Sequence, residues 1–202
     1  DDLIARTGCT VILCQEGATA GVDIRGGAPG SRETALLDPV NMVDKVHGVL
    51  LTGGSAFGLE AANGVMQFLE ERKVGFDVGV THVPIVPASV LYDLSVGDYR
   101  VRPNSKMGYQ ACINASDKEY RKGLVGAGAG ATVGKVLGQD FTMEGGIGTW
   151  SVKLGEIIVG AIVAVNAFGD IVDPKDNKIL AGARSSDLDR KSTRLNSSHG
   201  II

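Results

Sequence analysis

The residues that could do nucleophilic or acid–base chemistry are few, and they form no recognisable triad. Ahead of residue 189 the chain has two histidines, His47 at the start of an apolar segment and His82 before a proline-containing loop. Ser55, in the segment Gly-Gly-Ser-Ala-Phe, lacks the second glycine of the turn that presents a nucleophilic serine in α/β-hydrolases. Outside a motif, a structural histidine is more common than a catalytic one. The residues alone therefore do not support a Ser-His-Asp mechanism.

The side chains that could bind a metal are dispersed. Cys9, Cys14 and Cys112 lack the close paired spacing of a zinc site, and Asp93 and Asp98 have no partners at a recurrent ligand spacing. An odd number of thiols without such a motif is typical of a protein from a reducing compartment. We therefore expect free thiols, no metal, no cofactor and a cytoplasmic location.

The strongest local motif is a glycine-rich run. Residues 126–131 read Gly-Ala-Gly-Ala-Gly-Ala and match the G-x-G-x-x-A pattern of dinucleotide-binding turns, although alternating glycine and alanine matches it by chance. The same run is not a phosphate-binding P-loop, because Ala129 replaces a required glycine and Val136 follows Lys135 where serine or threonine is needed. Close packing of small residues against a sheet is the simpler interpretation, and dinucleotide binding is kept as an alternative.

The composition is that of a globular protein, of the size of one domain, with an unusual amount of glycine. Of 202 residues, 44% are hydrophobic and 21% are charged, which excludes a wholly disordered chain. The formal net charge of -3 gives no electrostatic reason to expect nucleic acid or an anionic membrane as a partner. No segment reaches the roughly 18 apolar residues of a membrane-spanning helix. The 29 glycines predict many tight turns and close backbone contacts.

Apolar periodicity and turn residues predict a mixture of strands and helices. Strands are expected at residues 10–13, 47–52, 74–80, 148–154 and 156–167, the last two forming a long hairpin at Gly155 that residues 170–172 extend. Helices are expected at residues 56–73, capped by Ser55, at residues 88–94 and 106–115, and after the glycine-rich run as far as Gly138. Neighbouring strands that pair, with helices covering a sheet, indicate an α+β fold rather than a doubly wound one.

Residues 189–202 do not resemble the rest of the chain. From Asp189 the sequence is polar and unpatterned, and eleven consecutive positions match the translation of a common sequencing adaptor. We therefore expect residues 189–202 to be a disordered artefact, and residues 1–188 to be a partial domain whose natural continuation is missing.

Five blocks of sequence occur in the same order as in a known family of hydrolases. They are residues 20–34 (AGVDIRGGAPGSRET), 49–66 (VLLTGGSAFGLEAANGVM), 83–94 (VPIVPASVLYDL), 125–135 (VGAGAGATVGK) and 159–169 (VGAIVAVNAFG). Together they resemble the DmpA-type aminopeptidases, a family of L-aminopeptidase/D-esterases and β-aminopeptidases. The resemblance covers nearly all of residues 8–184.

This resemblance implies an α/β/β/α sandwich of the DmpA and ornithine acetyltransferase-like type, incomplete at its C-terminus. It also implies a precursor that cleaves its own chain and exposes an N-terminal Ser or Thr as the nucleophile, so that no histidine base is needed. The substrates implied are peptides, amides or esters with a free amino terminus, hydrolysed through an acyl-enzyme without a cofactor. The implied partners are the downstream chain after self-cleavage and further copies in a homo-oligomer.

The resemblance also assigns site residues. Asn166, in Val-Ala-Val-Asn-Ala-Phe-Gly, matches the asparagine whose side-chain amide helps to form the oxyanion hole. The same resemblance implies that Tyr92 and Asp93 lie in the block that approaches the substrate cleft. Gly53, Gly54 and Ser55 are expected either to supply backbone N–H groups to the substrate or to support the site by close packing. The resemblance implies that the family nucleophile lies downstream of residue 184 and is absent from this chain. The 202-residue chain alone is therefore expected to be inactive.

Two other interpretations are left open. A dinucleotide-dependent oxidoreductase would rest on residues 126–131, and tight binding of NAD or NADP would support it. A non-catalytic binding protein would keep the scaffold but lack the nucleophile, as a downstream sequence without Ser or Thr at the cleavage junction would indicate. No motif predicts whether α or β, or L or D, residues are preferred.

Overall fold

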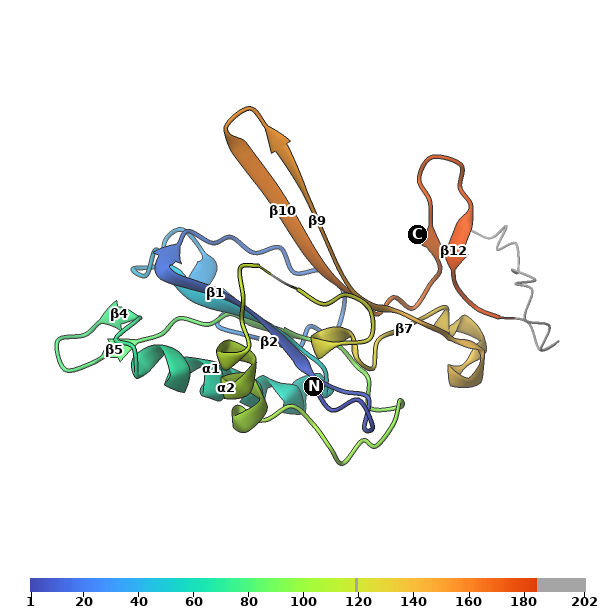
Figure 1. The fold of residues 1–202 in the computed structure, drawn as a ribbon, viewed down its shortest axis with the longest axis horizontal. Helices are drawn as coiled ribbons and strands as arrows, with labels where there is room; N and C mark the ends of the chain where they lie inside the picture. Colours follow the sequence, from blue (N-terminus) through green and yellow to red (C-terminus); the bar gives the residue numbers. More distant parts are fainter. Residues whose placement is uncertain (119, 185–202) are drawn as a thin grey trace.

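The computed structural model of the 202-residue chain describes residues 1–118 and 120–184 (Figure 1), so the predicted artefact at residues 189–202 lies outside the described residues. The strands are β1 (Cys9–Ala18), β2 (Ser31–Arg32), β3 (Val46–Thr52), β4 (Phe76–Asp77), β5 (His82–Val83), β6 (Ala88–Val90), β7 (Thr132–Val133), β8 (Met143–Glu144), β9 (Gly146–Leu154), β10 (Ile157–Val165), β11 (Ile171–Val172) and β12 (Ile179–Ala181). The helices are α1 (Ala61–Glu70) and α2 (Ser105–Ile113), and the 3₁₀ turns are η1 (Ala35–Leu37), η2 (Ser55–Glu60), η3 (Gly126–Gly128), η4 (Lys135–Leu137) and η5 (Gln139–Phe141). The predicted α+β class is confirmed.

The main sheet has four strands in the order β1-β3-β6-β2. β1 and β3 are antiparallel, with Leu13 opposite Gly48, and β6 is antiparallel to β2. β3 and β6 are parallel, with Leu50 opposite Ala88. Parallel strands need a crossover, and η2 with α1 supplies it between β3 and β6.

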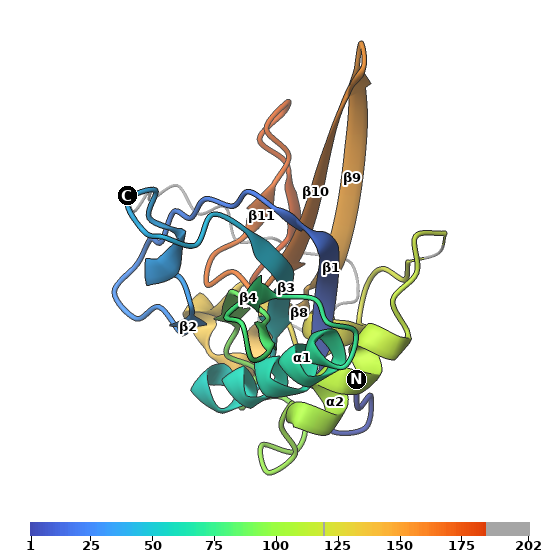
Figure 2. The same cartoon turned by 90° about the vertical axis from the view of Figure 1, so that its left-hand side faces the viewer.

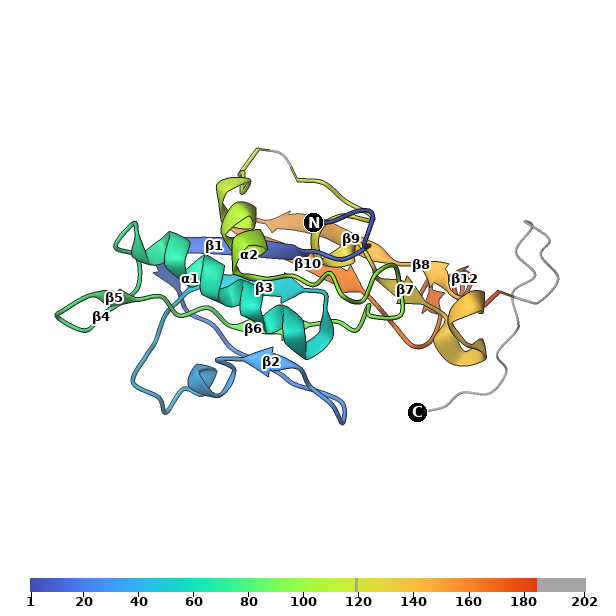
Figure 3. The same ribbon diagram turned by 90° about the horizontal axis from the view of Figure 1, so that it is seen from below.

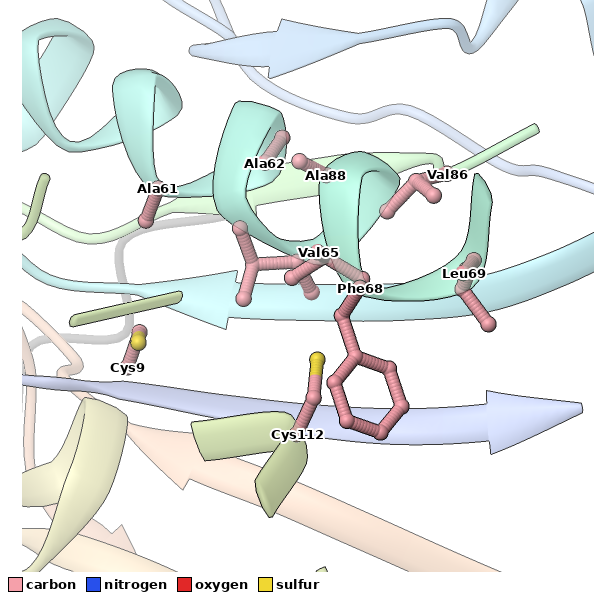
Figure 4. Packing of buried hydrophobic residues seen from close by; sticks show 10 residues of the cluster. Cys9, Ala61, Ala62, Val65, Phe68, Leu69, Val86, Ala88 and Cys112 are labelled. Carbon is pink, nitrogen blue, oxygen red and sulfur yellow. The ribbon is translucent and has the colours of Figure 1, made fainter. Parts of the chain in front are cut away.

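The two helices lie side by side on one face of this sheet (Figure 3). In α1, Ala62, Val65 and Leu69 recur every three or four residues, and all three are fully buried. They join the helical layer to the sheet in one apolar core (Figure 4). The buried members of this core are Cys9, Leu50, Ala61, Ala62, Val65, Phe68, Leu69, Val86, Ala88 and Cys112.

Two thiols belong to this core. Cys9 of β1 and Cys112 of α2 are buried, and Cys14 is half-buried; all three are free, as predicted. Burial raises the pKa of Cys9 to about 11 and that of Cys112 to about 12. A thiol whose pKa is raised in this way is a structural side chain rather than a nucleophile.

Two glycines set the distance between α1 and α2. A Cβ atom at Gly64 would overlap the backbone oxygen of Ser105, and a Cβ atom at Gly108 would overlap the backbone oxygen of Ala61. The backbones of the two helices therefore touch at this crossing, which no side chain larger than hydrogen would allow.

β9 and β10 form a long hairpin that projects away from the main sheet (Figure 2). Its pairing is unbroken from Gly146 with Val165 to Leu154 with Ile157, which confirms the predicted hairpin at Gly155. Paired residues point to the same side, so one side carries only apolar side chains and glycines. This apolar hairpin face consists of Gly146, Gly148, Trp150, Val152, Leu154, Ile157, Val159, Ala161, Val163 and Val165. Toward the tip it is open to solvent, and midway along β9 the residue Trp150 is 75% exposed.

Several local predictions are wrong. Residues 88–94 do not form a helix, because β6 pairs with both β3 and β2. Ser55 does not cap a helix; it begins the 3₁₀ turn η2 with φ 53°, directly after Gly54 with φ 81°. Within residues 74–80 the strand is limited to β4. Residues 170–172 do not extend the hairpin, because β11 pairs with β12.

His47 in β3 is buried, and its bonds require the neutral ring. Its Nδ1 accepts the backbone N–H of Ile85 at 3.1 Å. Burial lowers the pKa of His47 below the usual 6.5, and the charge of Lys45 acts in the same direction. Below pH 6.5 the unfolded chain binds a proton at His47 more readily than the folded chain does. We therefore expect neutral His47 to contribute fully to the free energy of unfolding above pH 6.5, and this free energy to fall as the pH drops below 6.5.

Urea unfolding of wild type and His47→Gln, at pH values between 8 and 5, measures this effect. Glutamine keeps a neutral acceptor but does not titrate. The variant should lose less stability than wild type as the pH falls through 6.5. Parallel curves for the two proteins would show that His47 does not contribute to the pH dependence.

Candidate active site

Asn166 follows β10 at the base of the hairpin, and hydrogen bonds fix the orientation of its carboxamide. Its Oδ1 accepts the backbone N–H of Thr132 at 3.0 Å and the Nζ of Lys135 at 2.9 Å. Its Nδ2 donates to the backbone oxygen of Tyr92 at 3.0 Å. A flipped amide would lose all three bonds, so the geometry decides which end carries the N–H groups. Nδ2 has a second N–H, for which the described part of the chain shows no acceptor.

The loop that follows β6 packs against the turn that follows β3. The N–H of Leu91 donates to the backbone oxygen of Thr52 at 2.9 Å, and the oxygen of Leu91 accepts the N–H of Ser55 at 3.1 Å. The carboxylate of Asp93 accepts the N–H of Gly54 at 2.7 Å. The site residues predicted in these two segments therefore lie close together. They lie next to the backbone oxygen of Tyr92, which accepts a hydrogen bond from Asn166.

The turn at residues 53–55 offers no unused backbone donor. The N–H of Gly53 donates to the backbone oxygen of Gly8 at 2.8 Å, and those of Gly54 and Ser55 are bonded to the loop after β6. A Cβ atom at Gly53 would overlap the carboxylate of Asp93. Of the two roles expected for these residues, the geometry fits close packing.

Asp93 is the one predicted site residue with a charged side chain, and it is buried. It is 2% exposed, and its Oδ2 accepts the hydroxyl of Thr7 at 2.8 Å. Burial raises the pKa of this carboxyl group, while the hydrogen bonds from Gly54 and Thr7 act in the opposite direction. None of the four ion pairs found within residues 1–118 and 120–184 includes Asp93. Its carboxylate is bonded instead to the backbone of Gly54 and the side chain of Thr7.

Lys135 belongs to the site, although the sequence prediction did not include it. Its Nζ lies 2.9 Å from both the backbone oxygen and Oδ1 of Asn166. Gly134, with φ 70°, turns the chain so that the N–H of Lys135 donates to the backbone oxygen of Phe168 at 2.7 Å. Partial burial lowers the pKa of this amine. The one signal in the sequence is a Gly-Lys pair at the end of a run of small residues.

The glycine-rich run is a packing element. It forms the short turn η3 and then β7, and the α-helix expected after it is not there. A Cβ atom at Gly128 would overlap the backbone N–H of Ile147, and one at Gly130 would overlap the backbone oxygen of Arg6. Without the N-terminus of a helix to hold a pyrophosphate, the dinucleotide interpretation loses its physical basis. The small residues instead let β1, the hairpin and the N-terminal segment meet.

Neither a membrane helix nor a metal cluster emerges from the described part of the chain. No helix there is both long enough and apolar enough to cross a membrane. The same residues contain no group of three His, Cys, Asp or Glu side chains that could hold a metal ion.

A model of Peptidase family S58 matches residues 1–198 of the chain. The chain belongs to peptidase family S58. A protein described as an uncharacterized aminopeptidase of Mycobacterium leprae is 48% identical over 174 residues. The resemblance to the DmpA-type aminopeptidases is therefore confirmed.

Another S58 relative is named for an activity. A 6-aminohexanoate-oligomer endohydrolase of Paenarthrobacter ureafaciens is 36% identical over 167 residues. The matches cover 82% of this chain and 46% of the Mycobacterium leprae protein, and 83% of this chain and 44% of the endohydrolase. This S58 chain spans about half the length of the curated relatives it matches.

Two solved structures share the fold of this S58 chain. A beta-aminopeptidase of Burkholderia sp. gives a TM-score of 0.58 at 23% identity, over 80% of this chain and 45% of that one. The L-aminopeptidase D-Ala-esterase/amidase of Ochrobactrum anthropi gives 0.51 at 18% identity, over 79% of this chain and 40% of that one, and is described as a variant of the Ntn hydrolase fold. The chain therefore has the fold of these Ntn-type aminopeptidases.

Proposed function

We propose that this chain is the N-terminal part of a self-cleaving aminopeptidase or amide hydrolase. Membership of family S58 supports hydrolysis, and the aminopeptidase and oligomer-hydrolase relatives support substrates with a free amino terminus. The chain covers about half of each relative, which supports a further half, and the family resemblance implies that this half lies downstream and carries the Ser or Thr nucleophile. We call the protein with that half the complete protein.

The proposed chemistry is acyl transfer followed by hydrolysis. The hydroxyl oxygen of the downstream nucleophile bonds to the substrate carbonyl carbon, the C–N bond breaks, and the amine leaves with the hydroxyl proton. Water then cleaves the resulting ester, returns a proton to the nucleophile and releases the acid. The oxygen of the carbonyl group becomes negative in each tetrahedral intermediate, so a fixed neutral donor lowers both barriers.

Asn166 is the proposed donor, and the orientation of its carboxamide is the observation that carries this proposal. Thr132 and Lys135 both donate to Oδ1, which leaves the N–H groups on the side of Tyr92. Lys135 is a positioning residue in this scheme, because its amine bonds to the carboxamide of Asn166. Because the oxygen of the carboxamide is held by these bonds, its N–H groups need little reorganisation when the oxyanion forms.

The apolar hairpin face supports the proposal that another polypeptide segment covers it. A strand hairpin with one fully apolar side is normally covered, because exposed apolar surface of this kind drives association. We propose the downstream half as its cover, in a cytoplasmic homo-oligomer of processed subunits. The 202-residue chain alone is expected to aggregate for the same reason.

The direct test compares the 202-residue chain with the complete protein. We expect the complete protein to appear as two fragments by mass spectrometry and to hydrolyse an aminoacyl p-nitroanilide, a β-alanyl p-nitroanilide or a 6-aminohexanoate dimer. Because the proposed nucleophile belongs to the downstream half, the 202-residue chain should release no p-nitroaniline above the rate in buffer. Alanine at the new N-terminal Ser or Thr is the control, and should abolish both cleavage and turnover.

Two results would contradict the proposal. Turnover by the purified 202-residue chain would show that the downstream nucleophile is unnecessary. A complete protein that stays uncleaved and inactive, with no Ser or Thr at the junction, would instead favour a non-catalytic protein that keeps the scaffold.

A further inference from the structure

We propose that Asp93 is a positioning residue whose two hydrogen bonds set the place of the Asn166 carboxamide. The inference rests on the function proposed for Asn166 in the preceding subsection. It gives Asp93 a different role from the one expected from the sequence, in which this block approaches the substrate.

The carboxylate of Asp93 faces the fold and is closed to solvent. Its Oδ1 accepts the N–H of Gly54 at 2.7 Å, its Oδ2 accepts the hydroxyl of Thr7 at 2.8 Å, and the residue is 2% exposed. A substrate's ammonium group could reach this carboxylate only if the loop opened. Burying a carboxylate costs free energy, which the two donors offset.

The residues around Asp93 pack closely against its side chain. A Cβ atom at Gly53 would overlap Oδ2, and a Cβ atom at Gly130 would lie 2.8 Å from the Cβ of Asp93. Gly54, which supplies the donor, has φ 81°, a conformation that favours glycine. One carboxylate therefore connects the loop after β6 to the turn after β3 and to the N-terminal segment, and the glycine-rich run packs closely against the same residue.

The loop that Asp93 anchors carries the acceptor for Asn166. Leu91 is bonded through its N–H to Thr52 and through its oxygen to Ser55. Tyr92 lies between Leu91 and Asp93, and its backbone oxygen accepts the Nδ2 of Asn166 at 3.0 Å. Because the loop is fixed on both sides of Tyr92, the position of this oxygen depends on the Asp93 anchor. A displacement of about 1 Å at a catalytic group can lower a rate about 10²-fold.

The test compares three variants of the complete protein. Asp93→Ala removes both acceptors, whereas Asp93→Asn keeps an oxygen for Gly54 and offers an N–H to the hydroxyl oxygen of Thr7. Asp98→Asn is the matched control, because Asp98 pairs with Arg100 at the surface. We expect Asp93→Ala to lower kcat about 30- to 100-fold with KM within about threefold, and Asp93→Asn to restore kcat to within about threefold of wild type.

The split between kcat and KM separates positioning from substrate binding. If the charge of Asp93 bound the amino group of the substrate, both variants would raise KM and asparagine would not restore activity. That result overturns the proposal, as does an equal loss of kcat in Asp93→Ala and Asp93→Asn. If Asp93→Ala does not fold, Thr7→Val, which removes one of the two bonds, should give a smaller loss of kcat at unchanged KM.

A second measurement does not depend on activity. The N–H of Thr132 donates to Oδ1 of Asn166, so its hydrogen exchange reports the place of the carboxamide. In Asp93→Ala we expect exchange about tenfold faster at both Gly54 and Thr132, with neither affected in Asp93→Asn. Faster exchange at Gly54 alone would show that Asp93 stabilises its own turn and would overturn the proposal. If the complete wild-type protein is inactive, the proposed function fails, and the exchange at Thr132 still decides the role of Asp93.

Discussion

Turnover by the complete protein is expected to fall about 10²- to 10³-fold when Asn166 is replaced by alanine. The carboxamide is held by two donors to its oxygen and by one N–H bonded to Tyr92, and the proposed role of its second N–H is to donate to the oxyanion. The loss should therefore appear in kcat, with KM nearly unchanged. Steady-state kinetics with an aminoacyl p-nitroanilide measure both constants, and self-cleavage is followed in parallel by mass spectrometry.

The variant Asn166→Asp separates the proposed donation to the oxyanion from the hydrogen bonds that hold the side chain in place. A carboxylate at this position still accepts from Thr132 and Lys135 but carries no N–H, so kcat should fall at least as far as in Asn166→Ala. Asn41→Ala, which removes a carboxamide bonded to the backbone oxygen of Ala35, is the control and should retain wild-type kinetics. Wild-type turnover in Asn166→Asp would exclude the donor role.

Gly108→Ala is expected to lower the free energy of unfolding of the complete protein by roughly 1–3 kcal/mol. Helix propensity alone predicts the opposite sign, because alanine is favoured over glycine inside a helix by about 1 kcal/mol. The new methyl group would overlap the backbone oxygen of Ala61, and backbone cannot move aside as a flexible side chain can. Urea unfolding measures the change.

Gly160→Ala is the matched control for this substitution. No heavy atom lies within 4 Å of the position that its Cβ would take, so we expect a change near zero or a slight gain. Equal stability of Gly108→Ala and wild type would mean that α1 and α2 can separate without cost.

Elements whose partners are close in the sequence could be predicted, and elements whose partners are distant could not. The β9–β10 hairpin follows from two apolar segments and the turn at Gly155, all within about 20 residues. β6 is a short apolar segment between prolines and a charged residue, and nothing local distinguishes it from a helical turn. It is a strand because β3 and β2 lie on either side of it, and such pairing outweighs local preference.

The same distinction applies to the site. Only the family resemblance points to Asn166, since a single asparagine after an apolar strand has no chemical signature of its own. In the sequence, Lys135 matches only the lysine of a P-loop, a motif that the surrounding residues do not complete. Its bond to Asn166 joins positions 31 residues apart and depends on the left-handed turn at Gly134. No spacing rule in the sequence encodes that turn.

The two buried thiols of the core allow the opening of the helical layer to be measured. At neutral pH, a thiol with a pKa of about 11 or 12 is thiolate in only about one molecule in ten thousand or fewer. Cys9 lies in the sheet and Cys112 in α2, so an alkylating reagent reaches both when the layer lifts from the sheet. Half-buried Cys14 provides the reference rate within the same molecule. The ratio of alkylation rates therefore reports how often the helices leave the sheet.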